Sequence, residues 1–420
     1  MRLEALSLLC VLVLSGCAVA PRRPAPPAVL SGAAPDGFPA TVRLVTTDLR
    51  GFTRDAPRFF SGLRKAAAGR PVNILELSGG GSAGAFGAGA LVGLTQARER
   101  PRFELVTGVS AGALIAPFAF LGSSWDSQLK AAFTTEHRGL FFRSPVWQFI
   151  SRLLSPLGHV QDDPLYRLVN RYVTPALLAA VARESRSGRR LIVATTDLDS
   201  QETVLWDMSA IAAQGGPAAR ALFRDVLVAS ASVPGFFPPV LIHVHEGARA
   251  YDELHVDGGV TTSVFAFPLV ATLALRDIPP LRGGKLYMIV NGQLAHLPDT
   301  TPVTTLTVLR KSFSAALTYN TRETILDTVT LANTLGMHFR LTEIPVGYPV
   351  KSSVDFDPRY MRKLFDYGER CAAAGLLWST PEQANRLNMN ARRDPADAEP
   401  ACPGPADAAS HTQAGVAHPP

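Results

Sequence analysis

A Gly-x-Ser-x-Gly pentapeptide, with Ser110 between Gly108 and Gly112, is the feature that most restricts how this chain folds. An apolar run at 103–106 precedes it, and a helix-like run at 113–121 follows it. A strand, a tight turn and a helix in that order are the context that makes such a pentapeptide a nucleophile elbow. The two glycines leave room for a sharp turn. We therefore expect the Ser110 hydroxyl to stand at the carboxyl end of a strand, beside a helix N-terminus.

A second glycine motif lies upstream, in the loop 79–84 (Gly-Gly-Gly-Ser-Ala-Gly). It follows an apolar run at 72–77, which is typical of a buried strand, and leads into a small-residue helix at about 84–96. Consecutive glycines let the backbone fold tightly and turn its N–H groups outward, where they suit an anion or a transition-state oxyanion. The candidate oxyanion donors are the N–H groups of Gly79, Gly80, Gly81 and Ala111.

The same loop also fits a dinucleotide-binding fingerprint, because Gly79, Gly81 and Gly84 have the spacing Gly-x-Gly-x-x-Gly. The next strand, however, runs into the elbow instead of ending in an acidic residue that would bind a ribose. No Lys-Ser or Lys-Thr follows the glycines, which excludes a Walker-type phosphate-binding loop. An oxyanion hole beside a nucleophilic serine accounts for both glycine motifs, so we expect no nucleotide.

A serine nucleophile needs a base, and Asp257 is the candidate, at the end of a strand-like run at 249–256. Gly258 and Gly259 follow it and predict a tight turn. Because the ordinary pKa of an aspartate is about 3.9, burial would have to raise it for base catalysis at neutral pH. An aspartate that merely caps its own turn is the alternative interpretation. His255, two residues earlier on the same strand face, is an alternative base.

These motifs together resemble the patatin-like phospholipases, a family of serine acyl hydrolases. Four segments between about residues 70 and 300 carry the resemblance: the glycine loop 79–84, the elbow 108–112, the segment 229–238 and the Asp-Gly-Gly at 257–259. The resemblance implies an α/β fold, a three-layer α/β/α sandwich with a largely parallel central sheet and helical cap additions. It also implies a Ser–Asp dyad without a histidine, with Ser110 as nucleophile and Asp257 as base. The supporting motif glycines are Gly84, Gly108, Gly112, Gly258 and Gly259.

The resemblance further implies release of fatty acid from phospholipid or related lipid esters through an acyl-enzyme, with no metal or organic cofactor. The loop departs from the family pattern, since Ser78 stands where an aspartate is common and Ala83 where an arginine is common. Losing the arginine removes a fixed positive charge, which leaves the substrate preference open. Two alternatives remain: an esterase or thioesterase acting on soluble acyl substrates, and a catalytically silent lipoprotein that uses the fold as a binding module.

The amino terminus predicts a location. The ten-residue apolar stretch 5–14 is too short to span a membrane, which takes about twenty residues, and fits a secretory signal. Residues 14–17 (Leu-Ser-Gly-Cys) resemble a bacterial lipobox, with cleavage after residue 16 and acylation of Cys17. The residue after this cysteine is Ala18 and not an aspartate, which resembles lipoproteins sent to an outer membrane. We expect an envelope protein anchored at Cys17; a plain secretory signal is the alternative.

The remaining organisation follows from composition. Residues 1–16 are the predicted signal peptide, 17–40 a proline-rich tether, 41–390 the hydrolase domain and 391–420 a disordered tail. An apolar content of 47% supports a sizeable core. The formal charge of +6 includes no dense Lys/Arg cluster, so we expect a lipid partner and no nucleic acid. The sequence does not indicate an oligomeric state.

Four further expectations concern single elements. Residues 312–335 and 358–377 read as outer helices, the second capped by Asp357. Cys10 lies in the predicted signal peptide and Cys17 is the predicted acylation site, so Cys371 and Cys402 remain. Outside the cytoplasm these two could form a disulfide if they lie close together in space. His243 and His245 share a strand face without further residues at metal-ligand spacing. Aromatic residues in the segment between elbow and base could line an acyl channel, form a membrane-facing lid or belong to the core: Phe141, Phe142, Trp147 and Phe149.

Overall fold

The computed structural model describes residues 22–26, 29, 32–135, 163–265, 281–298, 300–393 and 401–404. The predicted signal peptide (1–16), the acylation site Cys17 and most of the predicted tail lie outside these residues. The four aromatic residues Phe141, Phe142, Trp147 and Phe149 lie outside them as well. None of the helices within the described ranges has the length and apolar content needed to cross a membrane.

One mixed sheet of ten strands forms the middle layer of the molecule. Five parallel strands run from the middle of the sheet to one edge in the order β5-β4-β3-β9-β10. These are β3 (Asn73–Leu77), β4 (Leu105–Val109), β5 (Arg190–Asp197), β9 (Lys285–Val290) and β10 (His338–Glu343). Antiparallel strands extend the sheet beyond β5: β1 (Ala34–Pro35), β2 (Arg43–Val45), β6 (Glu202–Asp207), β7 (Val240–Glu246) and β8 (Arg249–Asp257).

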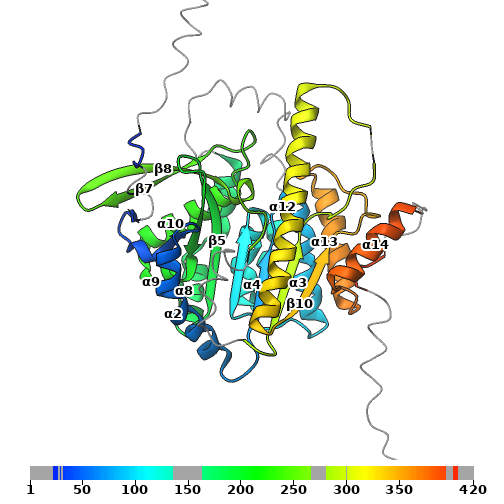
Figure 1. The fold of residues 1–420 in the computed structure, drawn as a ribbon, viewed down its shortest axis with the longest axis horizontal. Coiled ribbons are helices and arrows are strands. Elements are labelled where there is room, and N and C mark those ends of the chain that lie inside the picture. Colours follow the sequence, from blue (N-terminus) through cyan, green and yellow to red (C-terminus); the bar gives the residue numbers. More distant parts are fainter. Residues whose placement is uncertain are drawn as a thin grey trace, which may run out of the picture.

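Helices cover both faces of the sheet (Figure 1), because its central strands bury apolar side chains alternately on either side. On β3, Leu75 and Leu77 enter the larger core, whereas Ile74 enters a second core on the other face. The larger core includes α3 (Gly84–Gln96), α4 (Ala111–Leu121), α5 (Asp126–Thr134), α7 (Pro164–Tyr172), α8 (Pro175–Ser185), α9 (Met208–Gln214), α10 (Gly216–Ser230) and α13 (Pro358–Ala373). The opposite face carries α2 (Leu49–Ala67), α12 (Thr305–Leu335) and α14 (Pro381–Arg393). The predicted three-layer α/β/α sandwich is confirmed.

Predicted and observed elements differ at several ends. The strand predicted at 103–106 starts later and continues to Val109, directly before the elbow serine. The helix predicted at 312–335 begins seven residues earlier, where the Thr304 side chain caps Thr307 N–H. Asp357 caps α13 as predicted, but the helix ends at Ala373, and Gly375 follows in a left-handed conformation (φ 73°) that stops it.

Both ends of the described chain contact the domain. Arg22 Nη1 lies 2.5 Å from Asp199 Oδ2, and the short strand β1 pairs with β7. Part of the segment predicted as a tether therefore packs against the sheet, and its role as a tether stays a prediction. At the other end Cys371 and Cys402 form a disulfide, which links α13 to the start of the predicted tail.

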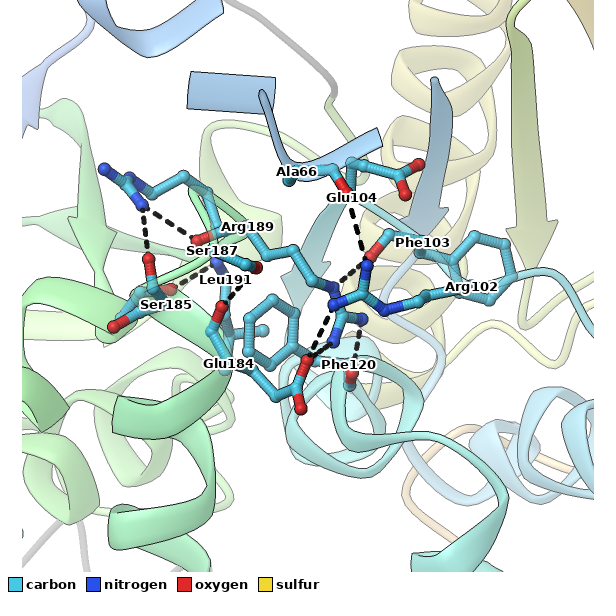
Figure 2. Close-up of polar contacts among 12 residues, drawn as sticks. Ala66, Arg102, Phe103, Glu104, Phe120, Glu184, Ser185, Ser187, Arg189 and Leu191 are labelled. Atoms are coloured by element: carbon cyan, nitrogen blue, oxygen red, sulfur yellow. Dashed lines mark hydrogen bonds and ion pairs between the residues drawn. The ribbon is translucent and has the colours of Figure 1, made fainter. Parts of the chain in front are cut away.

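A buried arginine fixes the helix that carries the elbow (Figure 2). Arg189, just before β5, is 3% exposed; its Nε donates to Phe103 O at 2.7 Å and its Nη2 to Phe120 O at 2.5 Å. Its Nη1 donates to Glu184 Oε2 at 2.6 Å. Because Phe120 O belongs to the last turn of α4, the guanidinium satisfies a carbonyl that lacks an intrahelical partner and lies at the negative end of the helix dipole. The end of α4 distant from the elbow is thereby tied to the starts of β4 and β5.

We expect Arg189→Met to lower the free energy of unfolding by about 3 kcal/mol, because it leaves two buried carbonyls without a donor. Arg102→Met is the matched control: Arg102 Nη2 reaches the same Glu184 carboxylate at 3.1 Å, but its side chain is 40% exposed. Its loss should cost less than about 1 kcal/mol. Urea unfolding of the two variants measures both free-energy changes. Equal losses would show that buried Arg189 stabilises the fold no more than Arg102, which would contradict the prediction.

Candidate active site

Ser110 lies in a strained turn between β4 and α4. Its φ is +53°, a region that non-glycine residues rarely occupy and that is often retained for function. A Cβ at Gly108 would come within 2.6 Å of Gly112 O, and one at Gly112 within 2.3 Å of Leu77 O. Both glycines are therefore required by close backbone approach. The structure places the serine at the strand–turn–helix junction that the sequence predicts.

The sheet brings Asp257 to this serine. Strand β8 is antiparallel to β5 but overlaps only its last three residues, with Thr195 opposite Asp257. The final residue of β8 therefore reaches the end of the sheet where the parallel strands terminate. Ser110 Oγ donates to Asp257 Oδ2 at 2.5 Å, and both side chains are buried. Asp257 Oδ1 accepts from Gly259 N–H at 2.7 Å. One carboxylate thus caps its own turn and also contacts the serine, so the two interpretations of Asp257 are compatible.

Burial changes the acidity of Asp257. Removal from water disfavours the charged form and raises the pKa of this carboxyl to about 7, against the opposing hydrogen bonds from Ser110 and Gly259. A carboxylate with a pKa near neutrality accepts a proton far better than an ordinary aspartate while staying partly ionised at pH 7. The burial that base catalysis would need is present.

The glycine loop lies beside the serine, since a Cβ at Gly79 would be 3.2 Å from Ser110 Cβ. A Cβ at Gly80 would come within 1.9 Å of Asn291 O and one at Gly81 within 2.0 Å of Ser353 O, so larger residues do not fit. Within the described chain the N–H groups of Gly80, Gly81 and Ala111 have no hydrogen-bond partner.

Gly79 differs from the other predicted oxyanion donors, because its N–H already has a partner in this structure. Its N–H is already bound to Ser263 O at 3.0 Å, because the loop packs against the segment after Asp257. The three remaining predicted donors stay candidates. Gly84 has a different function in the loop: a Cβ there would lie 2.8 Å from Ala111 Cβ, so this glycine allows α3 and α4 to approach. Gly258 similarly lies against Ala194 O, 2.5 Å from where its Cβ would be.

Three polar residues hold the site together: Ser78, and two that the sequence did not single out, Asn291 and Ser230. Asn291 N–H donates to Ser78 Oγ at 2.8 Å and Asn291 Nδ2 donates to Ser78 O at 2.8 Å. Ser78 Oγ in turn donates to Gly79 O at 2.7 Å, so the serine at the family's aspartate position fixes the loop. Ser230 Oγ accepts from Ser110 N–H at 3.0 Å and donates to Ala194 O at 2.7 Å. Asn291 directly follows the apolar strand β9, and a polar residue at that position is the signal that could have identified it.

His255 faces other partners. Its Nδ1 lies 3.0 Å from Thr195 Oγ1 and its Nε2 3.2 Å from Glu253 Oε2, and Glu253 also pairs with Arg43. Both ring nitrogens are engaged in this buried network, whereas Ser110 Oγ contacts Asp257. The strand histidines His243 and His245 pair with Asp252 and Asp36, respectively. No group of three or more His, Cys, Asp or Glu side chains suited to a metal ion occurs among the described residues.

Ser110 and Asp257 open into a cavity of about 960 Å³. On the side of α4, α5, α7 and α10 its wall is apolar: Leu114, Phe118, Phe133, Leu165, Val169 and Leu227. On the side of α12 and the loops after β9 and β10 the wall is mixed, with apolar side chains such as those of Leu294, Leu297, Phe313 and Val350 beside polar and basic groups: Gln293, His296, Lys311, Thr318 and Lys351. An ester whose carbonyl carbon lies at Ser110 can therefore place an aliphatic chain on one side and a polar group on the other. Ala83, at the family's arginine position, adds only a methyl group to the wall.

Comparison with known proteins agrees with this geometry. Residues 75–270 match the family model described as patatin-like phospholipase, and this match spans both glycine motifs, Ser110 and Asp257. The resemblance found in the sequence is thereby confirmed: the chain carries a patatin-like phospholipase domain. A domain of this family supports a lipid acyl hydrolase activity. No curated protein matches the chain.

Two solved structures are similar in part. VipD from Legionella pneumophila is 13% identical, with a TM-score of 0.32; the match covers 76% of this chain and 69% of VipD. A chain from the complex of full-length SpcU with full-length ExoU, from the type III secretion system of Pseudomonas aeruginosa, is 16% identical, with a TM-score of 0.29. That match covers 63% of this chain and about half (53%) of the other. At such scores these structures add no argument about function.

The raised pKa of Asp257 predicts an unusual stability effect. Between the unfolded pKa near 3.9 and the folded value of about 7 the folded state binds more protons, so the contribution of this residue to stability falls as the pH rises. We expect Asp257→Asn to raise the free energy of unfolding at pH 8 by about 2 kcal/mol, and to change it little at pH 4. Urea unfolding at the two pH values tests this.

Asp252→Asn on the same strand is the control for that measurement. Burial opposes ionisation there, but hydrogen bonds from Arg23 N–H and His243 hold the pKa of Asp252 below its ordinary value. Its substitution should therefore destabilise the protein at pH 8. If Asp257→Asn instead lowers the free energy of unfolding at pH 8, burying the ionised Asp257 carboxylate does not destabilise the folded protein, and the prediction is contradicted.

Proposed function

We propose that this protein is a serine acyl-ester hydrolase that releases fatty acid from phospholipids or related lipid esters by a Ser110–Asp257 dyad. The observation that carries the proposal is the 2.5 Å contact from Ser110 Oγ to the buried Asp257 carboxylate, where an apolar cavity wall meets a wall that also carries polar and basic groups. The family match supports the lipid substrate class. The residue roles rest on geometry and on the raised pKa of Asp257.

In the first step Asp257 takes the Ser110 hydroxyl proton while Oγ attacks the ester carbonyl carbon. The carbonyl π electrons move to oxygen, and the N–H groups of Gly80, Gly81 and Ala111 are placed to bind the resulting oxyanion. When the intermediate collapses, the bond to the alcohol oxygen breaks and Asp257 returns its proton to that oxygen. The acyl group is left as an ester on Ser110.

Water completes the reaction. Asp257, again ionised, takes a proton from a water molecule as its oxygen attacks the acyl carbonyl carbon. Collapse of the second intermediate breaks the bond to Ser110 Oγ, which receives the proton from Asp257, and the fatty acid leaves. Every proton passes through one carboxyl group whose pKa of about 7 allows both directions of transfer near neutral pH.

We propose further that the enzyme works in a bacterial cell envelope, tethered to the outer membrane by acylated Cys17. The lipobox-like segment 14–17 supports the anchor. The Cys371–Cys402 disulfide supports an oxidising compartment, since such bonds rarely persist in the cytoplasm. Labelling with a radioactive fatty acid during expression tests the anchor: the chain should incorporate label and Cys17→Ala should not.

Ser110→Ala and Asp257→Asn should each reduce fatty-acid release from phospholipid vesicles by at least about a thousandfold, because each removes a group that forms or breaks a bond. Mass spectrometry of the released lipids measures the rate and identifies which ester is cut. His255→Gln is the matched control on β8 and should retain at least about a tenth of the activity. An Asp257→Asn rate near that of the unmodified chain would contradict the dyad.

The pH dependence follows from the same carboxyl. Because only ionised Asp257 accepts the serine proton, kcat/KM should rise about tenfold per pH unit below pH 7 and level off above it. The profile is measured from pH 5 to 9 on a soluble short-chain ester, so that vesicle properties do not enter. A profile that is flat between pH 5 and 7 would show that a group of ordinary aspartate acidity is the base.

A further inference from the structure

Helix α12 has two halves with different environments. From Thr321 onward, side chains at helical spacing are buried against the sheet: Thr321, Ile325, Thr328, Leu331, Ala332 and Leu335. In the preceding half, 305–320, nearly every described side chain is exposed. Figure 1 shows this half, in yellow, extending past the carboxyl ends of the strands. A helix segment that makes few core contacts yet sits at the open end of the active site suggests a role outside the core.

One side of the projecting half belongs to the cavity. Thr307, Lys311, Ser314 and Thr318 line it at intervals of three or four residues, as expected for one helical face. Val308 and Leu309 point away from that stripe and are 45% and 60% exposed. The helix therefore separates the cavity from a solvent-facing apolar surface.

Exposed apolar residues gather here more than elsewhere. Of the twelve large hydrophobic side chains exposed among the described residues, six belong to the projecting half of α12, to the segment that leads into it or to the loop after β10. We call them the α12 rim: Leu297, Val303, Val308, Leu309, Phe313 and Val350. Leu297, Phe313 and Val350 also line the cavity, so apolar surface continues from inside the mouth to the outside of the helix. Such a patch on a protein surface marks a site of interaction.

The projecting half of α12 carries only basic charges, Arg310 and Lys311. Acidic residues lie just outside it: Asp299 and Glu323 along the chain, and Asp355 and Asp357, which pair with Lys351 beside Val350. A helix with exposed apolar residues and only basic charges fits the interface of a bilayer that contains anionic lipids, where the side chains enter the headgroup region and the bases attract phosphates.

We propose that the α12 rim docks this enzyme onto the surface of a bilayer containing anionic phospholipid, with the cavity mouth facing the lipid. This inference rests on the proposed function, because a lipid substrate is held in that bilayer. Docking through the rim lets a lipid chain pass from the membrane into the apolar side of the cavity without crossing water. A lipid anchor at Cys17 would keep the enzyme near the membrane, whereas the rim would orient its mouth.

The test compares two leucines of one helix. Leu309 belongs to the rim and is 60% exposed; Leu326, about 25 Å further along the helix, is 61% exposed and lies outside the rim. Each is changed to Asp in the full chain carrying Cys17→Ser, to remove the predicted anchor, and Ser110→Ala, to prevent hydrolysis. Binding to vesicles of phosphatidylcholine and phosphatidylglycerol is measured by sedimentation. We expect Leu309→Asp to weaken binding by about tenfold or more and Leu326→Asp by less than about twofold.

Equal binding of the Leu309→Asp variant and its parent would overturn the proposal, and so would an equal loss in Leu326→Asp. Size-exclusion chromatography without vesicles tests whether the rim binds a second copy of this chain instead. If the parent is a dimer and Leu309→Asp is a monomer, the rim is a subunit interface and the docking proposal is overturned. With Ser110 restored, Leu309→Asp should hydrolyse a soluble short-chain ester at the parent rate, which shows that the variant is folded. If the parent with Ser110 does not hydrolyse that ester, the proposed function is contradicted. The sedimentation result still shows whether the α12 rim binds the bilayer.

Discussion

The hydrogen bond from Ser110 Oγ to the carboxylate of Asp257 is the contact on which the arrangement of the sheet converges. A buried carboxylate is costly, and here its two oxygens are satisfied by Ser110 and by Gly259 N–H. The serine comes from the end of the parallel strand β4, whereas the aspartate comes from the antiparallel strand β8. Only a mixed sheet in which β8 overlaps the last residues of β5 brings the two together. The strained φ of Ser110 and the burial that raises the pKa of Asp257 both destabilise the fold locally. They persist because the packing of the surrounding core offsets them.

The sequence predicted the parts of this site whose geometry is local. A glycine on each side of Ser110 and two glycines after Asp257 specify turns within a few residues, and the apolar runs before them specify strands. The helix predicted at 84–96 matches α3, because its small residues allow close packing wherever it lies. Partners from distant segments were not predictable in the same way. The N–H of Gly79 binds Ser263, and Ser230 holds the backbone of Ser110, only because the sheet folds those segments together.

The errors at element ends have similar causes. The first residues of α12 are threonine, valine and leucine, which favour strands or loops as readily as helices, so its start was placed too late. Its N-cap at Thr304 and its packed second half carry the helix through that segment. The sequence does not predict whether Cys371 and Cys402 pair, because spacing along a chain does not fix distance in space; the fold brings their Cα atoms to 5.5 Å. In each case tertiary packing decided what local propensity left undetermined.

Covalent trapping of the nucleophile tests the central claim most directly. The purified chain is treated with an alkyl fluorophosphonate, an ester-hydrolase inactivator that forms a stable bond to an activated serine, and the labelled peptide is identified by mass spectrometry. The account predicts a single adduct on Ser110, none in Ser110→Ala, and labelling of Asp257→Asn slowed by at least about a hundredfold, because the amide cannot accept the proton. Labelling of another serine, or undiminished labelling in Asp257→Asn, would contradict it.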